Sequence, residues 1–156
     1  LSGSDEEVRG YMRELTEKGC YTVSEKVLSG IRESFEAGCC DDTQTKASIA
    51  EVFGSRGYLM DTHTAVAYHV LEQYRADTGS DAPCVVVSTA SPYKFALDVL
   101  SALGEQAEGA AALGALSEKT GTAMPAALAS LTEQEIRFGG AIEPEDMLSF
   151  VEDYLS

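Results

Sequence analysis

The sequence predicts a helix-rich α/β fold. Apolar residues recur at helical spacing through most of the 156 residues, and capping residues or glycine mark the ends of these stretches. Residues 84–87 are instead continuously apolar and rich in valine, which is typical of a strand buried on both faces of a mainly parallel sheet. The chain is 44% hydrophobic and 24% charged, the balance of a globular protein.

Two amphipathic helices are expected near the start of the chain. Ser4, followed by three acidic residues, is predicted to cap the first helix, and Gly19 ends it. Ser24 is predicted to cap the second, which ends at Gly38. The apolar positions at helical spacing are Val8, Tyr11, Met12 and Leu15 in the first helix and Val27, Leu28, Ile31 and Phe35 in the second.

A third helix is expected to begin near Asp42 or Thr43 and to end before Gly54, and a fourth is expected over residues 62–76. Short linkers connect the first three helices, as in a compact bundle or in the helical cover of a sheet. The apolar positions are Ala47, Ile49, Ala50, Val52 and Phe53 in the third helix and Ala65, Val66, Val70, Leu71 and Tyr74 in the fourth.

The predicted strand follows a turn at residues 77–83. Its partners are either weak extended segments of this chain or strands outside it, because one strand cannot form a sheet. Ser91 and Pro92 then supply the N-cap and first-turn proline of a helix that ends at Gly104. The inward positions of this helix are Phe95, Val99, Leu100 and Leu103.

The remaining third of the chain is rich in alanine and glycine. Residues 105–115 are expected to be loosely helical, and Pro125 opens a short helix. Residues 143–145, Glu-Pro-Glu, open the last helix, in which four apolar residues are expected to face inward: Met147, Leu148, Val151 and Leu155.

The charge balance excludes some functions. Eleven Lys and Arg against 26 Asp and Glu give a net charge of −15, which argues against binding to nucleic acid or to an anionic membrane surface. The longest apolar runs are too short to span a bilayer, and no signal peptide opens the chain. The chain begins without Met, as a fragment or a trimmed chain would. We therefore expect a cytoplasmic protein.

The cysteines and histidines do not predict a metal site. Cys20, Cys39, Cys40 and Cys84 lack CxxC spacing, and we expect free buried thiols in a reducing cytosol; a disulfide framework or a metal site is the alternative. His63 and His69 are six residues apart and therefore lie on different faces of a helix.

Residues 88–95, Ser-Thr-Ala-Ser-Pro-Tyr-Lys-Phe, form the first candidate site. They leave the carboxyl end of the predicted strand and enter a helix N-terminus, where open α/β sheets bind ligands and where backbone N–H groups attract anions. Lys94 is the only Lys or Arg between Arg75 and Lys119, and the helix dipole disfavours a cation there. The alternative is that the hydroxyls of Ser88, Thr89 and Ser91 only cap the helix and that Lys94 is solvated.

Residues 61–68 form the second candidate site. Asp61 or Thr62 is predicted to cap a helix, with His63 in its first turn. His63 is a candidate for orienting a phosphate or for acid–base chemistry. The alternative is a structural histidine that is held by hydrogen bonds.

These two segments, in this order, resemble the C-terminal portion of bacterial threonine synthases. The chain has GYLMDTHTAVAYHV at 57–70 and VVVSTASPYKF at 85–95. The family has roughly Asp-Pro-His-Thr-Ala-Val and Ser/Ala-Thr-Ala-His/Ser-Pro-x-Lys-Phe. Thr62 stands where the family usually has Pro, and Ala96 stands where Pro often follows Lys-Phe. The resemblance covers residues 1–104, and residues 105–156 are expected to be a helical C-terminal extension.

The resemblance implies the C-terminal part, residues 1–156, of a fold-type-II pyridoxal-phosphate enzyme related to the β-subunit of tryptophan synthase. The parent enzyme would be a lyase that converts O-phospho-L-homoserine and water into L-threonine and phosphate, the last step of threonine biosynthesis. In this fold type a Ser or Thr near the C-terminus contacts the ring nitrogen of the cofactor. Thr89 matches this position best and Ser88 second, while Lys94 and His63 are candidates for shaping the site or binding phosphate.

The resemblance also implies what the chain lacks. The Schiff-base lysine and the loop for the cofactor phosphate would lie upstream of residue 1, and Lys94 belongs to a different motif. No catalytic residue is therefore expected in the chain, which alone should be inactive and prone to self-association. The alternative is a non-catalytic acidic helical module that binds a protein partner. Another fold-type-II enzyme, such as a dehydratase, is a third hypothesis.

Overall fold

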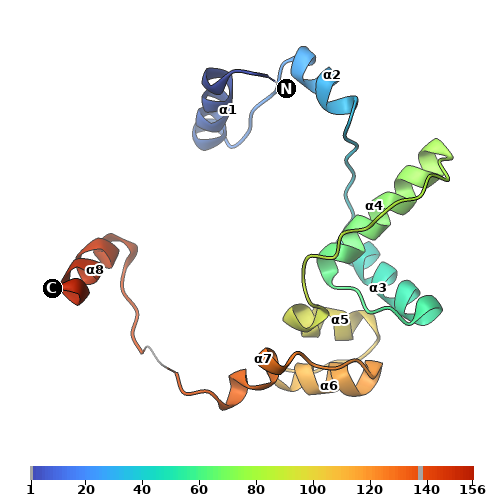
Figure 1. The fold of residues 1–156 in the computed structure, drawn as a ribbon, viewed down its shortest axis with the longest axis vertical. Coiled ribbons are helices and arrows are strands. Elements are labelled where there is room, and N and C mark those ends of the chain that lie inside the picture. Colours follow the sequence, from blue (N-terminus) through green and yellow to red (C-terminus); the bar gives the residue numbers. More distant parts are fainter. Residues whose placement is uncertain (1, 137–138) are drawn as a thin grey trace.

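The computed structural model describes residues 2–136 and 139–156, and all regular structure in these ranges is helical. Figure 1 shows that the helices in the middle of the chain lie together, while those nearest the two termini stand apart from them. The α-helices are α1 (Asp5–Lys18), α2 (Glu25–Arg32), α3 (Asp42–Arg56), α4 (Thr62–Thr78), α5 (Ala96–Ala102), α6 (Ala111–Thr120), α7 (Ala126–Ala129) and α8 (Met147–Leu155). The 3₁₀ helices are η1 (Pro92–Phe95), η2 (Leu131–Glu133) and η3 (Pro144–Asp146).

The predicted helix starts are confirmed. Ser4 caps α1 by accepting a hydrogen bond from the Glu7 amide at 3.2 Å, and Ser24 caps α2 in the same way. At α3, Asp41 and Gln44 form a reciprocal capping box, which places the start where the sequence predicts it. Each cap satisfies backbone N–H groups that have no partner within the helix.

Two predicted helix ends are wrong. The second helix ends at Arg32, six residues before Gly38, and the third continues through Gly54 to end at Gly57, which has φ 67°. A glycine inside a helix costs about 1 kcal/mol relative to alanine, which the packing of α3 outweighs. Gly57 instead adopts the left-handed conformation that ends helices and that glycine adopts without strain.

The hydrophobic core lies between α3, α4, α5 and α6. Helix α3 packs on both α4 and α5, and α5 packs on α6 and η1, so that the core is built around α5. The fully buried residues include Ile49, Val99, Leu100 and Leu116. The sequence predicts that the first three helices form a compact bundle or the cover of a sheet. Neither arrangement is present in the described residues, because Figure 1 shows α1 and α2 away from this core and the regular structure is helical throughout.

The predicted buried strand at 84–87 is not formed. These residues are extended but unpaired, and the side chains of Val85 and Val87 are 89% and 70% exposed. A strand is stable only when a neighbour satisfies its backbone N–H and C=O groups. No other part of the described chain pairs with this segment, so the expected parallel sheet and its α/β class are absent from the described residues.

The C-terminal third forms less helix than the sequence predicts. Residues 105–108 have no regular structure, residues 109–110 form a turn, and α6 begins only at Ala111; it buries Ala112 and Leu116. Pro125 opens α7 and Pro144 opens the last helical segment, as predicted. The inward positions predicted for the last helix are wrong, because Met147, Leu148, Val151 and Leu155 are all exposed. Helix α8 lies at the end of a long connection and does not pack on the core (Figure 1).

Other expectations concern cysteines, metals and membranes. The four cysteines are free thiols, but they are not buried as expected: Cys40 is partly buried and the other three are exposed. Within the described ranges, His, Cys, Asp and Glu side chains do not gather into a group able to hold a metal ion. Over those same ranges, no helix has the length and hydrophobicity needed to cross a bilayer.

Candidate functional site

Asp61 begins α4 and organises the first candidate cluster. Its backbone is extended, its side chain is fully buried, and its Oδ1 atom accepts hydrogen bonds from the amides of His63 at 2.9 Å and Thr64 at 3.4 Å. Its Oδ2 atom accepts a further bond from the Thr64 hydroxyl. The structure therefore assigns the N-cap to Asp61 rather than Thr62.

The Asp61 carboxyl is held as a carboxylate. Burial has the largest effect and raises its pKa, because removal from water disfavours the charge. The hydrogen bonds from the Thr64 side chain and from the His63 and Thr64 amides, with a further bond from the His63 side chain, together outweigh burial. The pKa of Asp61 is therefore lowered from its ordinary value. A buried negative charge at this position also faces the positive end of the α4 dipole.

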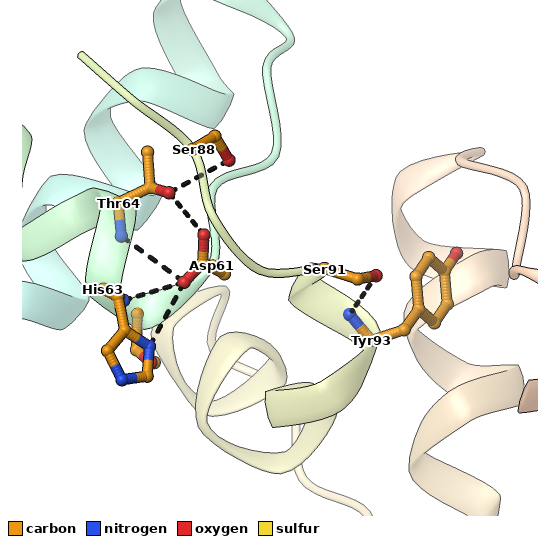
Figure 2. Close-up of polar contacts among 7 residues, drawn as sticks. Asp61, His63, Thr64, Ser88, Ser91 and Tyr93 are labelled. Carbon is orange, nitrogen blue, oxygen red and sulfur yellow. Dashed lines mark hydrogen bonds and ion pairs between the residues drawn. The ribbon is translucent and has the colours of Figure 1, made fainter.

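Thr64 joins α4 to the extended segment before η1. The Oγ atoms of Thr64 and Ser88 lie 3.0 Å apart, and Thr64 is buried while Ser88 is exposed. Figure 2 shows Ser88 above Thr64 and the Asp61 carboxylate below it, so that the three side chains form one chain of polar contacts. The two motif segments, residues 57–70 and 85–95, are thus in direct contact.

His63 lies at the same helix start but on its exposed side. Its Nδ1 atom is 3.3 Å from Asp61 Oδ1, and its side chain is 66% exposed. The ring lies against that of Phe95, with centroids 5.0 Å apart. Asp61 and Phe95 therefore orient the imidazole, and the exposed Nε2 edge remains open to a ligand.

An open cavity of about 320 Å³ lies beside His63. Its lining includes Lys46 from α3 and Asp98 from α5, together with Cys40 and Val66. The Lys46 ammonium donates a hydrogen bond to the Ser101 hydroxyl at 3.1 Å. The cavity thus holds one cationic side chain near His63, in an otherwise acidic chain.

Ser91 and Pro92 open a helical segment as predicted, but it begins as a 3₁₀ helix. The Ser91 hydroxyl accepts from the Tyr93 amide at 3.3 Å, and the Ser91 carbonyl oxygen accepts from the Lys94 amide at 3.0 Å (Figure 2). The backbone bends at Phe95 before α5 begins at Ala96. Lys94 therefore lies in the single turn of η1, which leads directly into α5. It stays near the N-terminal end of the helical segment, where the helix dipole disfavours a cation.

The predicted ligand residues differ in how they are held. Within the described ranges, the exposed side chains of Thr89 and Lys94 make no hydrogen bond or ion pair, whereas His63 and Ser88 contact the Asp61–Thr64 pair. The structure thus brings His63 and Ser88 into one cluster and leaves Thr89 and Lys94 open to solvent.

Sequence reasoning missed Thr64 and Tyr93. Thr64 stands three residues after Asp61, at the position whose amide a capping carboxylate reaches, and this spacing could have identified it. Tyr93 is buried in the core, and its hydroxyl contacts Thr122, 29 residues away, which no local pattern shows.

Comparisons with known proteins show the family of this chain. Residues 64–147, more than half of the chain, match the family model described as "Threonine synthase, C-terminal". The chain is 33% identical over 119 residues to threonine synthase from Pseudomonas aeruginosa, which covers 76% of this chain and 22% of that protein. It is 37% identical over 71 residues to the Corynebacterium glutamicum threonine synthase (46% of this chain, 14% of the relative). It is 29% identical over 83 residues to human threonine synthase-like 1 (53% of this chain, 11% of the relative).

A solved structure agrees with the sequence matches. The crystal structure of pyridoxal-phosphate-bound threonine synthase from Brucella melitensis superimposes with a TM-score of 0.67 and 33% identity, over 96% of this chain and 28% of that one. The helical arrangement of this chain thus matches part of a threonine synthase structure. The chain belongs to the threonine synthase family, whose C-terminal region it matches. It spans about a fifth or less of the curated relatives named above.

Proposed function

We propose that this chain, residues 1–156, is the C-terminal part of a threonine synthase that uses pyridoxal phosphate to convert O-phospho-L-homoserine and water into L-threonine and phosphate. The observation that carries the proposal is the 33% identity, over 96% of the chain, to a threonine synthase solved with that cofactor. We further propose that the parent protein has the α/β fold of type-II pyridoxal-phosphate enzymes. Residues 105–156 would be its helical C-terminal extension, and the remaining catalytic machinery would come from outside this region.

Thr89 is the proposed contact of the cofactor ring. Its hydroxyl is exposed and makes no hydrogen bond among the described residues, so it fits a ligand atom that requires one neutral donor. When bound, pyridoxal phosphate supplies an electron-withdrawing pyridine ring. A neutral hydroxyl at the ring nitrogen would leave that nitrogen unprotonated, whereas a carboxylate would favour its protonation. Thr89 would thereby set how strongly the ring withdraws electrons.

His63 and Lys94 are the proposed phosphate contacts. Within the described ranges the Lys94 ammonium is unpaired and presents N–H donors. The exposed edge of the His63 ring presents a further N–H donor when both ring nitrogens carry a proton, and the rest of the chain is strongly acidic. Donors on a cation bind a phosphate dianion more strongly than neutral donors do. Asp61 fixes the orientation of His63, which reduces the entropy that the ring would lose on binding.

The test is made on the protein at the full length that its gene encodes. We expect bound pyridoxal phosphate to give visible absorbance and the protein to release phosphate from O-phospho-L-homoserine. Thr89→Ala should shift the cofactor absorbance and lower the rate of phosphate release at least tenfold. Thr43→Ala is the matched control, since Thr43 is also exposed and makes no side-chain hydrogen bond within the described ranges.

Two other results would contradict the proposal. A folded full-length protein with neither cofactor absorbance nor phosphate release would exclude the enzyme function and favour a non-catalytic module that binds a protein partner. Cofactor absorbance with turnover of a hydroxyamino acid, and not of O-phospho-L-homoserine, would favour a dehydratase.

A further inference from the structure

The extended segment before η1 has a single distant attachment. Among the described residues, the Thr64–Ser88 contact at 3.0 Å is the one hydrogen bond that links residues 81–90 to another part of the fold. The other side-chain bonds of this segment are local: the Ala82 amide donates to Ser80, and the Cys84 thiol donates to Ala82. The position of Thr89, the residue after Ser88, therefore depends on Thr64.

The base of this attachment is rigid. Thr64 is 4% exposed and lies in the first turn of α4, and Asp61 is fully buried and caps that helix, which packs on α3. The Asp61 carboxylate accepts the hydroxyl and the amide of Thr64, so the Thr64 side chain is held in one orientation (Figure 2). Because the Thr64 hydroxyl is held in one orientation, its hydrogen bond restricts the position of Ser88.

The contacts of these two neighbouring hydroxyls separate Ser88 from Thr89. The Thr64 hydroxyl has donor geometry toward both the Asp61 carboxylate and Ser88 Oγ, and its single proton serves one of these acceptors at a time. The Ser88 hydroxyl is thus engaged by Thr64, whereas the Thr89 hydroxyl makes no hydrogen bond among the described residues.

We propose that Thr64 is a positioning residue that holds Ser88 and so aims the Thr89 hydroxyl at the cofactor ring nitrogen. This inference rests on the proposed function for the identity of the ligand. Ser88 is thereby assigned to the attachment and Thr89 to the ligand, although both lie at the same end of the extended segment.

The experiment compares four variants of the full-length protein. Thr64→Val and Ser88→Ala each remove one side of the contact, and Ser88→Ala does so at an exposed residue, which protects against a failure to fold. Thr64→Ser keeps the hydroxyl. Thr45→Val is the matched control, because Thr45 is buried in the first turn of α3 and its hydroxyl donates to Asp41 and not to the extended segment.

The first readout needs no cofactor. Elastase cleaves after small apolar residues in flexible segments, and mass spectrometry locates the cut. In the cofactor-free protein, cleavage within residues 81–90 should accelerate at least threefold in Thr64→Val and in Ser88→Ala. It should remain at the wild-type rate in Thr64→Ser and Thr45→Val. Equal cleavage rates in all proteins would overturn the attachment.

The second readout is the cofactor itself. Thr64→Val should weaken pyridoxal-phosphate binding at least threefold and shift its absorbance toward that of Thr89→Ala, and Thr64→Ser should restore both. Wild-type absorbance in Thr64→Val would overturn the positioning role. If the wild-type protein binds no pyridoxal phosphate, the proposed function fails, and the cleavage rates still decide whether Thr64 holds the segment.

Discussion

The Tyr93 hydroxyl donates a hydrogen bond to the carbonyl oxygen of Thr122 at 2.7 Å, across 29 residues of sequence. The same carbonyl accepts from the Ser117 hydroxyl at 2.9 Å. Tyr93 belongs to η1, at the end of the second sequence motif, and Thr122 follows α6 in the alanine-rich region. The contact therefore joins the alanine-rich region around α6 to η1, the last part of the candidate segment at residues 88–95.

Tyr93→Phe should lower the free energy of unfolding by about 1 kcal/mol, because the Thr122 carbonyl loses one of its two donors while the ring remains packed. Chemical denaturation measures the change. Tyr58→Phe is the control, since Tyr58 is 52% exposed and its hydroxyl makes no hydrogen bond within residues 2–136 and 139–156; it should change stability by less than about 0.5 kcal/mol. Equal effects of the two variants would contradict the assigned contact.

Asp61→Asn should reduce the loss of stability in acid. The pKa of Asp61 is lowered in the folded protein, so its contribution is complete above the ordinary aspartate pKa of about 3.9 and is lost as the pH falls through the folded value. Denaturation curves between pH 3 and pH 7 should therefore fall less steeply below pH 4 for the variant. At pH 7 the variant should be about 1–2 kcal/mol less stable.

Asp81→Asn is the matched control for this pH dependence. Asp81 is exposed in the turn after α4 and its carboxylate accepts no hydrogen bond in the described part of the chain. Its variant should follow the wild-type curve at every pH. If Asp61→Asn also follows that curve, the hydrogen bonds at the start of α4 do not stabilise the carboxylate.

Gly38→Ala should destabilise the fold, although Gly38 lies outside any helix. A Cβ atom there would lie 2.9 Å from Val70 Cγ1 and 3.2 Å from Gln73 Oε1, on the face of α4. Because the Val70 side chain has little rotamer freedom, the backbone must shift, at a cost of about 1–3 kcal/mol.

Gly54→Ala should instead raise the stability of the fold by about 0.5–1 kcal/mol. Gly54 lies inside α3, and nothing lies within 4 Å of the position that its Cβ atom would take.

Leu116→Ala and Leu148→Ala should differ strongly. Leu116 is fully buried in the core, and its truncation leaves a cavity that costs about 2–5 kcal/mol. Leu148 in α8 is 70% exposed, and its truncation should change stability by less than about 0.5 kcal/mol. Thermal or chemical unfolding of the two variants checks the comparison. A large effect at Leu148 would show that α8 packs against something in solution.

The sequence predicts those parts of the fold that depend on neighbouring residues. The caps at Ser4, Ser24 and Asp61 are confirmed because a side-chain oxygen reaches an amide two or three residues ahead, whatever the rest of the chain does. Ser91 and Pro92 likewise mark the start of η1. The motif residues around these caps were sufficient to indicate the threonine synthase family.

Properties that depend on distant residues were predicted poorly. The valine run at 84–87 has the composition of a strand, but pairing requires a second extended segment, and no local pattern contains that information. Gly54 was expected to end a helix, yet tertiary packing carries α3 past it. At the candidate site, the sequence predicts His63 and Ser88 as site residues. It does not predict the hydrogen bond between Thr64 and Ser88, because these residues are 24 positions apart.

The single attachment of the extended segment also determines where the chain can change in length. The Thr64–Ser88 contact spans 24 positions of sequence, but residues 64–78 belong to α4, so the loop proper is residues 79–88. Most of this loop is exposed, and apart from the Thr64–Ser88 contact it makes only local hydrogen bonds. The entropy cost of closing a flexible loop rises only with the logarithm of its length, by about 0.6 kcal/mol for each doubling. Insertions in the turn after Gly79 should therefore be tolerated, while the deletion of even a few residues between Pro83 and Ser88 would pull the serine away from its threonine partner.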